Sequence, residues 1–76
     1  MDVNKLVRMA NQIAANFDYG ADQKHAVAGV LDHLTRFWTM AMKRQIVEYQ
    51  QQGETGLSKI SAEAVTQLAE RLGDAV

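Results

Sequence analysis

The sequence contains no cysteine, no proline and only short apolar runs. The absence of cysteine excludes a disulfide framework and any thiolate-based metal or redox site. A membrane span needs roughly 18 consecutive apolar residues, so we expect no membrane partner. Residues 1–5 lack the charged-then-apolar layout of a signal peptide, and we therefore expect a cytoplasmic protein.

Charge of one sign is also scarce, because eight basic and nine acidic residues give a net charge of −1. The overall field is too weak to favour nucleic acid or an acidic membrane as a partner. A hydrophobic content of 47% in 76 residues indicates one globular domain, residues 1–76. A domain of this size without disulfides must pack its helices tightly or gain stability from a partner.

Apolar residues recur at helical spacing in four segments, and no segment alternates as a half-buried strand does. We predict helices over about residues 2–18, 22–38, 40–52 and 58–72, and hence an all-α bundle of three to four short helices. The expected N-caps are Asp2, Asp22, Thr39 and either Ser58 or Ser61. The expected C-terminal stops are Gly20, Gly53 and Gly73.

Two features of the middle of the chain leave alternatives open. No proline or glycine separates the second and third segments, so they could form one helix of about 30 residues. We favour a break at Trp38–Met40, because Thr39 can cap a new helix. Gly29 lies at the rim of an apolar stripe, where it indicates either close approach by another helix or a tolerated glycine.

Phe37 and Trp38 form an adjacent aromatic pair in a chain with one tryptophan and two phenylalanines. Large aromatic rings anchor cores and interfaces alike, so filling the core is one interpretation of both. At 100° per residue, Trp38 lies about 50° from the centre of its helical stripe, whereas Leu34 and Phe37 point more directly inward. We therefore interpret Trp38 as an anchor that reaches past the core to a partner.

The polar residues do not converge on a recognisable reaction centre. His25 and His33 lie about 12 Å apart along one helix, too far to share a metal ion. We therefore expect no catalytic residue, no metal and no cofactor in this chain. A basic cluster beside the aromatic pair suggests a helix-turn-helix protein, but its positive charge is too small for a DNA-recognition helix.

Three blocks of sequence carry a family resemblance, and together they span most of the chain. They are residues 8–17 (RMANQIAANF), the pattern Ala26-x-x-Gly29-x-x-x-His33-x-x-x-Phe37-Trp38-x-Met40-x-Met42, and Leu57-Ser58-x-Ile60 followed by Ala64-Val65. In order and spacing they resemble the delta subunits of NAD-dependent, molybdenum-containing formate dehydrogenases. The family commonly has proline where this chain has Met40 and Lys59, the first positions of two expected helices.

The resemblance implies a small accessory subunit of a complex that oxidises formate to carbon dioxide and reduces NAD. It implies that the molybdenum centre, the flavin and the iron–sulfur clusters belong to the larger subunits, and that this chain supports assembly or stability of the catalytic subunit. A stand-alone regulatory module, either DNA-binding or self-associating, is the alternative. The expected partner-binding residues are Asn11, Gln12, Arg36, Phe37, Trp38, Met42, Lys43 and Arg44.

Overall fold

Four helices make up the computed structural model, which describes residues 2–18, 20 and 22–74 and the side chains of these residues except Asp74. The helices are α1 (Val3–Phe17), α2 (Gln23–Phe37), α3 (Met40–Gln51) and α4 (Lys59–Asp74). The described residues contain no strand. The expected all-α fold is therefore confirmed, with four helices.

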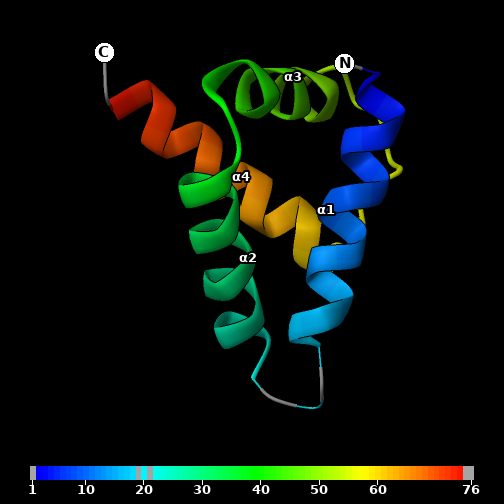
Figure 1. Cartoon of the computed structure of the whole chain (residues 1–76), viewed down its shortest axis with the longest axis vertical. Helices are drawn as coiled ribbons and strands as arrows, with labels where there is room; N and C mark the ends of the chain where they lie inside the picture. The colour runs from blue at the N-terminus through cyan, green and yellow to red at the C-terminus, as the bar shows by residue number, and fades with distance from the viewer. Residues whose placement is uncertain (1, 19, 21, 75–76) are drawn as a thin grey trace.

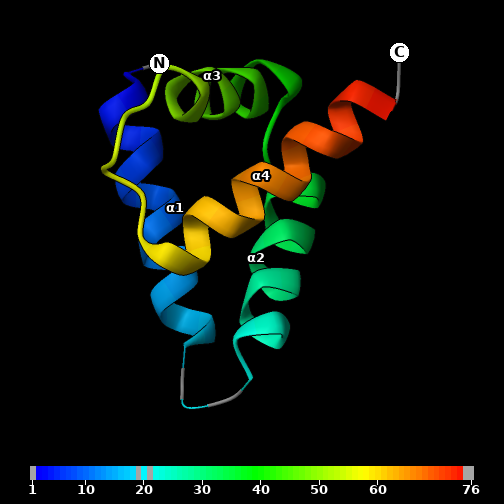
Figure 2. The same ribbon diagram turned by 180° about the vertical axis from the view of Figure 1, so that it is seen from behind.

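The helices pack around one core rather than in a line (Figure 1). α1 and α2 lie side by side and run in opposite directions, and α3 lies across one end of this pair. α4 crosses the pair diagonally and packs against the other three helices (Figure 2). The connection from α3 to α4 passes alongside α1 on its way to the start of α4.

The apolar stripe of each helix faces this common centre. Folding costs a large amount of chain entropy. Burying each large apolar side chain contributes roughly 1.5–3 kcal/mol, and the sum of these contributions offsets that cost. Leu34 of α2 and Ile46 of α3 are completely buried at the centre. The other fully or almost fully buried side chains of the cluster are Leu6, Val7, Ala10, Ala14, Val27, Val30, Leu31, Trp38, Val47, Ala64, Val65 and Leu68.

Gly29 allows α1 and α2 to approach closely. A Cβ atom added at Gly29 would lie 2.6 Å from the Phe17 ring, closer than real Cβ contacts. Of the two interpretations of this glycine, the structure confirms the close approach of another helix.

The helix starts lie where the capping residues predict them. The side-chain oxygens of Asp2 and Asp22 accept hydrogen bonds from backbone N–H groups at 3.0 and 3.1 Å. Thr39 Oγ1 accepts from the Met42 N–H at 3.2 Å, so a new helix begins at Met40 and the chain between Gln23 and Gln51 is not one continuous helix. These bonds satisfy donors that would otherwise lack a partner at the first turn.

α4 begins as expected and ends later than expected. Ser58 Oγ accepts from the Ser61 N–H at 3.3 Å, and Ser61 Oγ donates to the Ala10 carbonyl oxygen at 3.1 Å, which fixes the start of α4 on α1. The prediction that the helix stops at Gly73 is wrong, because α4 continues to Asp74. Among the described glycines only Gly20 and Gly53 have the positive φ of a left-handed turn; Gly73 keeps the helical course.

Candidate docking surface

The corner where α2 ends and α3 begins exposes two large apolar side chains. Phe37 is 69% exposed and Met40 is 47% exposed, whereas Trp38 between them is only 5% exposed. Large apolar side chains that stay exposed on both sides of one helix junction indicate a candidate interaction site. We call Arg36, Phe37, Met40 and Arg44 the corner surface.

The orientations predicted for Phe37 and Trp38 were wrong, because their roles are exchanged. The projection at 100° per residue assumes a helix that continues through Trp38. α2 ends at Phe37, and Trp38 has an extended backbone with φ −89° and ψ 141°. This change of direction turns the indole into the core cluster and leaves the Phe37 ring on the solvent side.

The Phe37 ring is held by a neighbour on the same helix. The ring centroids of His33 and Phe37 lie 4.8 Å apart, with an interplanar angle of 48°. The two residues are one turn apart, and a tilted geometry at this distance is favourable for aromatic pairs. A ring that is positioned in this way loses less freedom when a partner covers it.

The three basic residues near the corner have different partners. Arg36 Nε lies 3.2 Å from Asp32 Oδ1, but both side chains are well exposed, so this ion pair is worth little to stability. Lys43 Nζ donates to the Thr35 carbonyl oxygen at 3.0 Å and thereby caps the C-terminal end of α2. Among the side chains that the structure describes, no carboxylate pairs with Arg44, which is exposed.

The other expected partner-binding residues, Asn11, Gln12 and Met42, do not belong to the corner surface. Met42 is half-buried and packs against the core. The Asn11 amide holds the α3–α4 connection: its Nδ2 donates to the Gly56 carbonyl oxygen at 2.9 Å, and its Oδ1 accepts from the Ser58 N–H at 2.8 Å. Gln12 is exposed on α1 and donates to the Asn16 side chain at 3.5 Å. All four residues of the corner surface belong to α2 or α3, and none of them belongs to α1.

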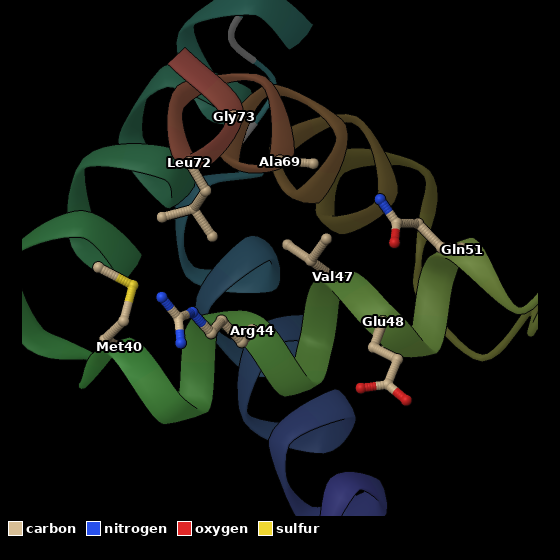
Figure 3. Close-up of a pocket in the computed structure, with 8 residues that line it drawn as sticks. All are labelled: Met40, Arg44, Val47, Glu48, Gln51, Ala69, Leu72 and Gly73. Atoms are coloured by element: carbon tan, nitrogen blue, oxygen red, sulfur yellow. The ribbon is translucent and has the colours of Figure 1, made fainter. Parts of the chain in front are cut away.

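A groove between α3 and α4 adjoins the corner surface (Figure 3). It has a volume of about 690 Å³ and is lined by Met40, Arg44, Val47, Glu48, Gln51, Ala69, Leu72 and Gly73. Ala69 and Leu72 were not among the expected partner-binding residues, because apolar spacing places Leu72 in the stripe of the last helix and Ala69 beside that stripe. Both are only half-buried, and an apolar residue such as Leu72 in the last turn of a helix is the signal that could have indicated them.

The described residues include no group of three or more His, Cys, Asp or Glu side chains that could hold a metal ion. None of the helices, in the part of the chain that the structure describes, is long and apolar enough to cross a membrane. The polar side chains with defined partners mostly serve the fold. Thr39 caps a helix, Lys43 closes another and Asn11 fastens a loop.

Comparison with known proteins identifies the family. No curated protein and no solved structure matches the chain. Residues 5–65 match the family model of the NADH-dependent formate dehydrogenase delta subunit FdsD. The matched region contains the three blocks that carry the resemblance, as well as Phe37, Met40 and Arg44. The chain therefore belongs to the family of formate dehydrogenase delta subunits.

Proposed function

We propose that this chain is a non-catalytic, cytoplasmic subunit that docks on the larger, molybdenum-containing subunit of formate dehydrogenase and supports its assembly or stability. Membership of a delta-subunit family supports association with the other subunits of that enzyme. In this proposal the chain holds no cofactor of its own, and its contribution is a rigid surface.

The observation that carries the proposal is the exposure of Phe37. The ring is 69% exposed at the end of a helix whose other large apolar side chains are buried. Covering a phenylalanine ring contributes roughly 1.5–3 kcal/mol, enough for the centre of a small interface. Arginine is among the residue types enriched at such centres, and Arg36 and Arg44 flank the apolar side chains.

The polar groups of the corner favour a structural role over a catalytic one. Thr39 Oγ1 is occupied by the Met42 N–H, and Lys43 Nζ is occupied by a carbonyl oxygen at the end of α2. A catalytic centre instead needs polar groups that converge on one point and remain available to a substrate. The corner offers apolar contact area and positive charge, which suit docking.

Co-expression with the other formate dehydrogenase subunits tests the proposal. We expect the tagged chain to co-purify with the molybdenum-containing subunit, and Phe37→Ser to weaken this association about 30-fold, as for an interface hot spot. Lys24→Ser, at the opposite end of α2 and also exposed, is the matched control and should bind like the unchanged chain. A chain that never co-purifies with any larger subunit contradicts the proposal.

A further inference from the structure

The α3–α4 groove has an apolar floor. Val47 of α3 and Ala69 and Leu72 of α4 face each other across it, and Met40 closes one end (Figure 3). The groove shares Met40 and Arg44 with the corner surface, so an occupant of the groove also contacts the corner. Two neighbouring helices with small and apolar side chains between them present the kind of surface on which a third helix packs.

The charges along the groove are not neutralised by each other. Arg44 and Glu48 are one turn apart on α3, a spacing that permits an ion pair, yet they form none. Figure 3 shows the Arg44 guanidinium turned toward Met40 and Leu72, whereas the Glu48 carboxylate points away from α4. The end of the groove nearest Met40 thus combines apolar side chains with a cation that has no described carboxylate partner.

We propose that this groove receives an amphipathic helix of a larger formate dehydrogenase subunit, which places apolar side chains on Val47, Ala69 and Leu72 and a carboxylate on Arg44. The inference rests on the proposed function, and it adds the place and the chemistry of the contact. Arg44 and Gln51 are seven residues apart, about 10 Å along α3, which matches two turns of a bound helix. Such a helix carries its anchors at positions i, i+3 or i+4, and i+7.

Charge at Arg44 gives the first test. The affinity of the purified chain for the formate dehydrogenase complex that lacks it is measured by titration at two salt concentrations. We expect Arg44→Gln to weaken binding about tenfold and Arg44→Glu about 100-fold, with a smaller salt dependence in the Gln variant. Arg8→Gln, which alters an exposed arginine on α1 outside both the corner surface and the groove, is the matched control and should weaken binding less than threefold.

Filling the groove gives the second test. Ala69→Trp places a large side chain over the floor, and we expect at least a tenfold loss of affinity in a variant whose circular dichroism shows that it remains helical. Unchanged affinity in both Ala69→Trp and Arg44→Glu overturns the groove as the contact, while the proposed function stands because the chain still binds. Failure of the unchanged chain to bind the complex overturns both.

A crosslink identifies the occupant. The chain contains no cysteine, so Ala69→Cys gives a single attachment point for a photoreactive benzophenone maleimide. We expect the crosslinked peptide to be a helix of a larger subunit with an acidic residue among its apolar anchors. A crosslink to a second copy of this chain, to a segment without helical apolar spacing, or to no larger subunit overturns the inference.

Discussion

Two adjacent aromatic residues lie in opposite surroundings, and this contrast determines what each can do. Trp38 packs in the core cluster, whereas Phe37 lies on the solvent side against His33. A buried tryptophan contributes to folding, and an exposed phenylalanine contributes only when a partner covers it. The change of backbone direction at Trp38 is responsible for the difference.

Alanine substitutions separate the two roles. Trp38→Ala leaves a large cavity and should lower the free energy of unfolding by about 3–5 kcal/mol, much of the stability of so small a domain. Phe37→Ala removes exposed surface and should change the free energy of unfolding by less than about 0.5 kcal/mol. Urea denaturation of both variants measures this. A greater loss of stability in Phe37→Ala than in Trp38→Ala would contradict the assignment of core and surface.

For single residues, the sequence predicted local capping roles better than the directions in which side chains point. The capping oxygens were predictable, because Asp2, Asp22 and Thr39 act on N–H groups only two or three residues away. The direction of Trp38 depends on where α2 ends, and a helical projection does not include that end. The role of Asn11 depends on the backbone of residues more than 40 positions away, which no local pattern encodes.

At the scale of helices, the junction between α2 and α3 organises the corner surface. Trp38 and Thr39 both have extended backbones, Thr39 caps α3, and Lys43 caps the end of α2. The two helices therefore meet at a defined corner, and this corner brings Phe37 and Met40 to the surface. In one continuous helix, the directions of Phe37 and Met40 would be set only by the 100° rotation per residue.

A proline at the first position of α3 tests this junction. Met40→Pro should cost less than about 1 kcal/mol of stability, because proline at the first helical position loses no helical hydrogen bond. The preceding residue, Thr39, already has the extended backbone that proline requires, with φ −68° and ψ 162°. Gln45→Pro, in the interior of α3, is the control and should cost about 3 kcal/mol or more.

Thermal melts of the two proline variants provide the comparison. Similar and large losses in both would show that the helix runs through Met40. Thr39 caps the helix that starts at Met40, so this chain begins α3 without the proline that the family resemblance leads us to expect there. The predicted end of α4 at Gly73 was wrong because Gly73 does not adopt the left-handed conformation by which a glycine commonly ends a helix.

At the scale of the whole molecule, much of the fold was accessible from helical periodicity. The stripes that form the core follow from apolar spacing within each segment, and the division between α2 and α3 follows from the capping residue Thr39. The α3–α4 groove was not accessible, because it depends on how far apart two separate helices pack. Small residues such as Ala69 leave space there, and their effect is visible only when both helices are in place.

The family assignment and the exposed surface both support the proposal that this chain docks on a larger subunit. The family places the chain among the subunits of formate dehydrogenase. The structure supplies a helical unit with an exposed apolar corner, a groove beside it and an arginine turned toward Met40 at one end of that groove. In the proposed role, most of the chain is scaffold, and the corner and groove are the parts that a larger subunit contacts.

Hydroxyl-radical footprinting of the free chain and of its complex with the larger formate dehydrogenase subunits tests the docking surface most directly. Phe37 and Met40 are exposed and react readily in the free chain, so their labelling should fall several-fold in the complex. Met9, half-buried on α1, should be labelled equally in both states. Unchanged labelling of Phe37 and Met40, with protection confined to residues 8–16 of α1, would contradict the account and place the interface on the Asn11–Gln12 side.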